Sequence, residues 1–216
     1  MNTAAKSPMT ILCLEFSSER RSAAIVCDGR VLAESSVIAG RTTSAPGLIA
    51  AVLKESGLTP TDVSRLAIGI GPGSYTGIRR AIATVQGWHL AHGTPVVPVG
   101  SFQTLALLAA ELDPGPLWLA ADAQRGEWAV APADGARLTG ELRLVRREDL
   151  AAWIVGGQRV VTPDATLTGA TRLYPSAAQA ALLAQELPPM DPSNLAPAYL
   201  REASFVKAPP SRWEAE

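Results

Sequence analysis

Apolar and polar residues alternate first with the spacing of β-strands. Apolar side chains dominate three short stretches near the start of the chain, Thr10–Phe16, Ser22–Cys27 and Val31–Ser36. Asp28 and Gly29 separate the second stretch from the third, and both residue types accept the positive φ of a two-residue hairpin turn. The pattern therefore predicts three consecutive antiparallel strands.

The pattern then changes to helices that alternate with single strands. Apolar residues recur every three or four positions, the spacing of an α-helix, in Ala45–Glu55, Thr76–His92 and Ser101–Leu112. Thr43-Ser44 and Ser101 are expected to cap the first and third of these helices, and Gly57 and Gly93 to end the first two. Strands are predicted between the helices, over Leu66–Ile70 and Pro95–Val99.

A second, shorter series of elements follows the break at residues 113–116 (DPGP). Its predicted strands and helices, in chain order, are Leu117–Asp122, Glu127–Pro132, Leu142–Arg146, Glu148–Val155, Arg159–Thr162 and Ser176–Leu187. Three antiparallel strands extended by β-α units is the element order of the ribonuclease-H-like fold, which actin-like ATPases share. We therefore predict an α/β protein with two ribonuclease-H-like lobes, of which the second is reduced.

The predicted lobes span residues 9–112 and 113–187. Residues 1–8 are expected to form a flexible lead. Residues 188–216 are expected to form a tail on the surface, extended because six prolines fall between Pro188 and Pro210.

Composition excludes several classes of protein. Hydrophobic residues make up 47% of the 216 residues and charged residues 18%, which excludes intrinsic disorder. The formal net charge is −1, so the chain lacks the overall positive field of a nucleic-acid-binding protein. No apolar run approaches about 20 residues, and residues 1–8 do not resemble a signal peptide. We expect a cytoplasmic protein without membrane contact.

The most informative segment is the glycine-rich turn at residues 69–79, GIGPGSYTGIR, between a predicted strand and a predicted helix. It lacks the Gly-Lys-Ser/Thr ending of a P-loop. Backbone amides at the start of a helix attract anions, whereas glycines can also serve close packing alone. Both interpretations stay open. The candidate anion-facing residues are Gly71, Gly73, Ser74, Thr76 and Gly77.

Candidate catalytic and metal-binding residues are few. Glu15 ends the first strand, but a magnesium site needs several carboxylates and the strand Leu66–Ile70 offers none. His89 and His92 lie three residues apart without a third ligand nearby. We interpret Glu15 as a capping or hairpin-facing carboxylate and the histidines as helix C-terminal residues. No catalytic residue and no metal ligand are predicted.

Four segments occur in the order and spacing of the bacterial TsaB (YeaZ) family. They are ILCLEFSS at 11–18, GIGPGSYTGIR at 69–79, DAQRGEW at 122–128 and LAPAYLRE at 195–202. The chain resembles this family over residues 9–207. It departs from the family pattern at Glu15, where Asp is usual, and at residues 42–45, which lack the usual His-Ser pair.

The resemblance implies a non-catalytic, actin-like subunit without a cofactor. It works with the paralogue TsaD and the ATPase TsaE to add threonylcarbamoyl to N6 of adenosine 37 in tRNAs that read codons starting with A. It also implies that the subunit meets tRNA only through the complex and forms a homodimer through the surface that it offers TsaD.

Two enzymatic alternatives remain. A catalytic threonylcarbamoyltransferase, or the metallopeptidase once proposed for this superfamily, would need the His-x-x-x-His pair of the catalytic paralogue. By element order that pair falls on Ser101 and Leu105, which have no imidazole. A small actin-like ATPase or kinase would need an adenine-binding glycine pair, for which only Gly156-Gly157 is available.

The first two predicted helices carry apolar residues on more than one face. A helix that covers only its own core shows one apolar stripe. In Thr76–His92, a second stripe of small residues includes one tryptophan, a residue type common at interface hot spots. We expect the partner and dimer interface at Leu48, Ala51, Val52, Arg80, Ala81, Thr84 and Trp88. The alternative is that the second lobe covers both stripes.

Overall fold

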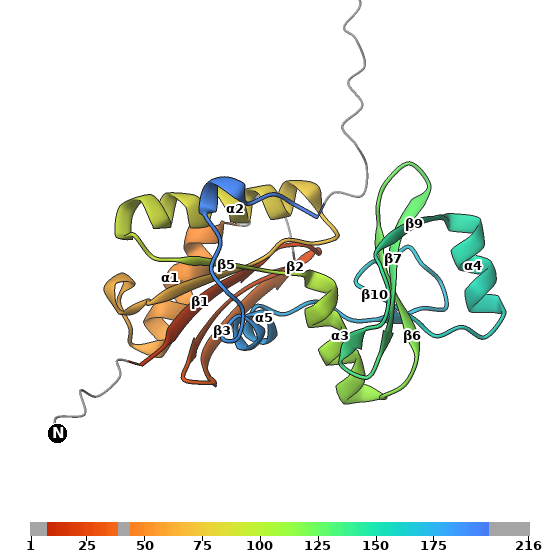
Figure 1. The fold of residues 1–216 in the computed structure, drawn as a ribbon, viewed down its shortest axis with the longest axis horizontal. Helices are drawn as coiled ribbons and strands as arrows, with labels where there is room; N and C mark the ends of the chain where they lie inside the picture. Colours follow the sequence, from red (N-terminus) through yellow and green to blue (C-terminus); the bar gives the residue numbers. More distant parts are fainter. Residues whose placement is uncertain (1–7, 39–43, 199–216) are drawn as a thin grey trace, which may run out of the picture.

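Two β-sheets lie side by side in the chain, with helix α3 (Ser101–Leu112) at their junction (Figure 1). The computed structural model describes residues 8–38 and 44–198, and the structural statements below concern these residues. The first sheet has the strand order β3-β2-β1-β4-β5, and the second has the order β11-β10-β6-β7-β8, with β9 paired to β7. The predicted fold class, an actin-like α/β fold with a reduced second lobe, is confirmed.

The first sheet is built around a strand that is buried on both faces. Its strands are β1 (Thr10–Glu15), β2 (Arg20–Cys27), β3 (Arg30–Ile38), β4 (Arg65–Gly69) and β5 (Val96–Val99). In β1, Leu12 and Leu14 enter one hydrophobic core, and Ile11 and Cys13 enter another on the opposite face. Because side chains alternate along a strand, this continuous apolar run requires helices on both sides of the sheet.

Helices α1 (Ala45–Ser56) and α2 (Tyr75–His92) cover one face of this sheet. Their ends follow the predicted signals. The Ser44 hydroxyl accepts a hydrogen bond from the Gly47 amide at 3.3 Å. Gly57 and Gly93 adopt left-handed conformations with φ of 71° and 69°, which permits each helix to stop there. The predicted helix boundaries are correct to within one residue.

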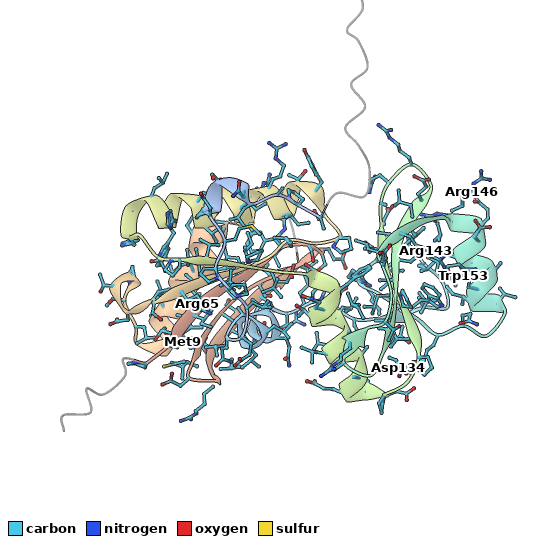
Figure 2. The ribbon with its side chains drawn as sticks, viewed as in Figure 1. Met9, Arg65, Asp134, Arg143, Arg146 and Trp153 are labelled. Atoms are coloured by element: carbon cyan, nitrogen blue, oxygen red, sulfur yellow. The ribbon has the colours of Figure 1, made fainter. Side chains whose placement is uncertain are left out.

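Helix α5 (Ala177–Leu183) covers the opposite face, below the sheet in Figure 1. Its alanines pack on β1, β2 and β4, and Arg65, labelled in Figure 2, donates to the Ala184 carbonyl oxygen at 2.9 Å. Residues 176–187 were predicted to form a helix of the second lobe that ends at Leu187. The helix ends instead at Leu183, and it packs on the first sheet. Its small alanine side chains permit this close packing against a sheet that lies far away in the sequence.

Helix α3 follows the first sheet in the sequence but packs on the second sheet. Residues 101–112 were assigned to the first lobe, yet Phe102, Leu105 and Ala109 pack against the second sheet. Ser101 was expected to cap this helix. It is instead the first helical residue after Gly100, and its hydroxyl is used elsewhere.

The second sheet is smaller. Its elements are β6 (Leu117–Asp122), β7 (Glu127–Asp134), β8 (Arg137–Leu138), β9 (Arg143–Arg146), α4 (Arg147–Val155), β10 (Val160–Thr162) and β11 (Thr171–Arg172). The two-residue strands β8 and β11 carry too short a pattern to be predicted. On the outer face, Arg143 lies 5.1 Å from the Trp118 ring, which in turn contacts Trp153 at 4.8 Å between ring centroids (Figure 2).

Residues 188–198 return to the first sheet. The Met190 amide donates to the Val96 carbonyl oxygen at 2.8 Å, and Leu195 enters the core beneath α1 and α2. A short 3₁₀ helix, η2 (Pro192–Asn194), lies on α2, where Gln86 donates to the Pro192 carbonyl oxygen at 2.8 Å. This part of the tail therefore forms part of the first lobe. Residues 1–7 of the predicted lead and residues 199–216 of the predicted tail lie outside the described residues.

The packing of α5 predicts the effect of enlarging one alanine. Ala180 is fully buried against the first sheet. Ala180→Leu should lower the free energy of unfolding by about 1–3 kcal/mol, because three added carbon atoms overpack the contact. The same change at exposed Ala152 on α4 should stay within about 0.5 kcal/mol. Urea denaturation of both variants measures this, and equal effects at the two positions would show that α5 does not pack tightly.

Candidate functional site

A buried carboxylate lies at the carboxyl end of β1. Glu15 has no solvent exposure. Its Oε1 accepts a hydrogen bond from the Ser17 amide at 2.7 Å, and its Oε2 accepts one from the Ser101 hydroxyl at 2.8 Å. Burial raises the pKa of Glu15 above its usual value, and the hydrogen bonds from Ser17 and Ser101 partly oppose that rise. Glu15 thus caps the turn of the β1–β2 hairpin, as predicted, and it also joins β1 to α3.

The glycine-rich turn packs directly against the backbone that follows Glu15. A Cβ atom at Gly77 would overlap the Phe16 carbonyl oxygen, and one at Gly73 would overlap the Ser17 carbonyl oxygen. Gly73 also has a φ of +145°, which side-chain-bearing residues rarely adopt. Both glycines therefore permit an approach between two backbone segments that any larger residue would block.

Several amides of this turn already have partners within the chain. The Ser74 amide donates to the Ser17 carbonyl oxygen at 2.6 Å, the Gly77 amide to the Ser74 hydroxyl at 3.3 Å, and the Gly71 amide to the Ser101 hydroxyl at 3.1 Å. These three donors are not available to an outside anion. The arrangement favours the packing interpretation of the turn.

By element order, the resemblance implies that the metal-binding pair of the catalytic paralogue corresponds to Ser101 and Leu105. The Ser101 hydroxyl is used by Glu15, and Leu105 is buried between α3 and the second sheet. Neither side chain offers a nitrogen ligand. Within residues 8–38 and 44–198, no three His, Cys, Asp or Glu side chains gather in a way that could hold a metal ion.

The two histidines have local partners at the end of α2. His89 Nδ1 lies 2.8 Å from the Thr94 carbonyl oxygen, and His92 contacts the Trp88 ring at 5.1 Å between centroids. These contacts agree with their interpretation as residues of the helix C-terminus.

Among residues 8–38 and 44–198, no helix is both long enough and apolar enough to cross a membrane.

Three residues of the predicted interface on α1 and α2 are not on the surface. Leu48, Val52 and Ala81 are buried in the core of the first lobe, so they are not available to a partner. Ala81 is buried because it lies three residues after Ile78 and four before Val85, on the face of α2 that packs on the sheet. Its assignment to a second, exposed stripe of the helix was therefore wrong.

Other predicted interface residues do reach the surface. Ala51 and Arg80 are exposed, whereas Thr84 and Trp88 are half-buried, and Trp88 donates to the Thr94 hydroxyl at 3.3 Å. The phase of the two helices also exposes residues that the sequence analysis missed, namely Gly47, Ala50, Thr76, Ala83, Gly87 and Leu90. Leu90 is 85% exposed. We call the surface formed by Gly47, Ala50, Ala51, Ala83, Gly87 and Leu90 the small-residue face.

Comparisons with known proteins agree with the sequence resemblance. The family model TsaD, described as tRNA N6-adenosine threonylcarbamoyltransferase, matches residues 41–151, just over half of the chain. The Escherichia coli K12 protein named tRNA threonylcarbamoyladenosine biosynthesis protein TsaB is 35% identical over 125 residues, which are 56% of this chain and 54% of that protein. The match thus spans about half the length of that relative. The Bacillus subtilis protein of the same name is 25% identical over 228 residues, covering 93% of this chain and 99% of that protein.

A solved structure supports the same conclusion over a larger part of the chain. YeaZ from Pseudomonas aeruginosa superimposes with a TM-score of 0.71 and 25% sequence identity. The superposition covers 89% of this chain and 100% of that one.

The close approach at Gly77 makes a specific prediction about stability. Gly77→Ala should lower the free energy of unfolding by about 1–3 kcal/mol, because the new Cβ must displace the Phe16 carbonyl group. Gly87 lies on the same helix with open space around it, so Gly87→Ala should stabilise the chain by about 0.5–1 kcal/mol. Thermal unfolding of the two variants compares them directly. A loss of stability at Gly87 and none at Gly77 would contradict the packing described here.

The raised pKa of Glu15 predicts a pH dependence. The folded protein binds the Glu15 proton more tightly than the unfolded chain does, so the stability that this proton provides is lost as the pH rises through the raised pKa. Wild type should therefore gain stability relative to Glu15→Gln as the pH falls from about 8 to about 5. Urea unfolding of both proteins at the two pH values tests this, and a difference that does not change with pH would refute it.

Proposed function

The chain belongs to the family described as TsaD, tRNA N6-adenosine threonylcarbamoyltransferase, as a member of its TsaB type, and we propose that it is a non-catalytic subunit in the synthesis of threonylcarbamoyladenosine. The modification is the addition of threonylcarbamoyl to N6 of adenosine 37 in tRNAs that read codons starting with A. The observation that carries the proposal is that Ser101 supports Glu15 and Leu105 fills the core, at the two positions where the resemblance implies the metal-binding pair of a catalytic relative.

The partner in this proposal is a TsaD-type catalytic chain, and its docking surface is the small-residue face. Small side chains on two neighbouring helices permit helices of another chain to approach closely. Exposed Leu90 adds an apolar contact that has no partner within the described chain. The same face would serve a homodimer, so that self-association and partner binding compete.

Two further parts of the proposal follow from the same role. A TsaE-type ATPase would act on the assembled pair, and tRNA would be held mainly by the other subunits, because this chain has a formal net charge of only −1 and no overall positive field. Since the substrate is tRNA, the place of action is the cytoplasm.

A reconstituted modification assay tests the proposed role. The purified chain alone should neither modify tRNA nor hydrolyse ATP. Adding it to a TsaD-type and a TsaE-type protein with tRNA and the threonylcarbamoyl donor should raise modification at least about tenfold, as expected for an obligatory subunit. Modification at the same rate without the chain would contradict the proposal. So would modification by the chain alone that Glu15→Ala abolishes.

A charged residue on the small-residue face tests the docking surface. Gly87 is exposed and has open space around its Cα, so Gly87→Arg should fold normally. A bulky cation at the centre of a close helix contact should weaken both self-association and TsaD binding by about 2 kcal/mol or more. Ala151→Arg, at an exposed position on α4, is the matched control. Light scattering and pull-down measure both associations, and unchanged binding by Gly87→Arg would move the interface elsewhere.

A further inference from the structure

Two consecutive arginines lie near the start of α2, next to the small-residue face. Arg79 and Arg80 are both exposed. The Arg79 guanidinium lies over the Tyr75 ring, with Cζ 5.2 Å from the ring centroid, and its Nη1 donates to the Tyr75 hydroxyl at 2.7 Å. These contacts hold one guanidinium in place on the surface, so less side-chain entropy is lost when an acidic group binds it.

Helical phase places Arg80 on the outward side of α2. The residues of this helix that face the core are Ile78, Ala81, Ile82 and Val85. Arg80 lies on the opposite side, three residues before Ala83 and seven before Gly87, and all three are exposed. Residues with this spacing share one side of an α-helix. Arg80 therefore extends the small-residue face toward the amino-terminal end of α2, and Arg79 borders it.

The exposed charges of α1 and α2 are mostly positive. Apart from the two histidines, the charged residues of these helices are Lys54, Glu55, Arg79 and Arg80, and all four are exposed. The segment that precedes α1, residues 39–43, adds Arg41 and no acidic residue. A second copy docked on this surface would bring the same excess of positive charge, whereas a partner with acidic side chains at this edge would neutralise it.

Neither arginine of α2 forms an ion pair within the described chain. The ion pairs among residues 8–38 and 44–198 are Arg159–Asp113 and Arg172–Glu19. Exposed guanidinium groups are hydrated, so the isolated chain loses little stability by leaving them without a carboxylate. Both charges are thus available to a partner on the surface.

We propose that Arg79 and Arg80 bind acidic side chains of the TsaD-type partner and thereby favour that partner over a second copy of this chain. The inference rests on the proposed function, which places both associations on the small-residue face. A protein carboxylate can accept charge-assisted hydrogen bonds from these guanidinium groups. RNA fits less well, because an RNA-binding surface contacts many phosphates and this patch has few cations beside small and apolar residues.

Removing the two charges tests this selectivity. The double variant Arg79→Gln/Arg80→Gln should weaken binding of the TsaD-type partner at least about tenfold, and it should leave self-association within about threefold of wild type or strengthen it. Arg146→Gln is the matched control, because Arg146 is exposed on the second lobe and makes no capping bond to α4 (Figure 2). It should change either association less than about threefold. Calorimetric titration measures partner binding, and sedimentation equilibrium measures self-association.

Salt dependence and double-mutant cycles provide further readouts. Raising NaCl from about 0.05 to about 0.5 M should weaken partner binding by wild type, because salt screens exposed charges, and the double variant should lose most of this dependence. Aspartates and glutamates on the partner's docking surface are then changed one at a time to Asn or Gln. The proposal expects at least one whose loss has no further effect once both arginines are Gln.

Several results would overturn the inference. If the wild-type chain fails to bind the TsaD-type partner, the proposed function fails and the role of the arginines fails with it. If wild type binds and the double variant binds equally well, or loses both associations equally, only the selective role is wrong. A clearly lower melting temperature of the isolated double variant would show that the arginines have a partner within their own chain. Binding of tRNA to the isolated chain that the double variant abolishes would assign them to RNA instead.

Discussion

The structure depends on one hydrogen-bonded contact between distant parts of the chain. Glu15, at the end of the central strand, accepts from the backbone of Ser17 and from the side chain of Ser101 at the start of α3. The hairpin that follows Glu15 then lies against Gly73 and Gly77 at the start of α2. A carboxylate with no solvent exposure is costly unless it is hydrogen-bonded. The positions of β1, α2 and α3 are thus set together.

The same contact explains how two sheets become one molecule. Helix α3 leaves the first sheet at Ser101 and packs on the second, and α5 returns from the second half to cover the first. Each lobe therefore needs a helix that the other half of the chain supplies. Glu19 beside β2 adds a direct bridge, because it pairs with Arg172 of β11 and accepts from Tyr174 at 2.8 Å. These links are distributed along the chain, and together they hold the two lobes against each other.

The sequence predicted local structure well and packing partners poorly. Every element predicted between residues 10 and 112 is present to within two residues, because caps, glycines and apolar periodicity act locally. The placement of α5 was wrong because an alanine-rich helix carries no signal for which sheet it will cover. Ala81 was misassigned because a stripe was counted without fixing the helical phase against Ile78, Ile82 and Val85.

The interior and the surface of the first lobe treat polar and apolar groups in opposite ways. At the edge of the first sheet the reactive groups are turned inward, with the Glu15 carboxylate buried and the Ser101 hydroxyl bonded to it. On α1 and α2 the opposite holds, because small side chains and exposed Leu90 leave the helices open to contact. An exposed apolar side chain beside small residues is typical of a surface that another helix covers, so this face of α1 and α2 is the feature of the described chain that best fits the proposed role in a complex.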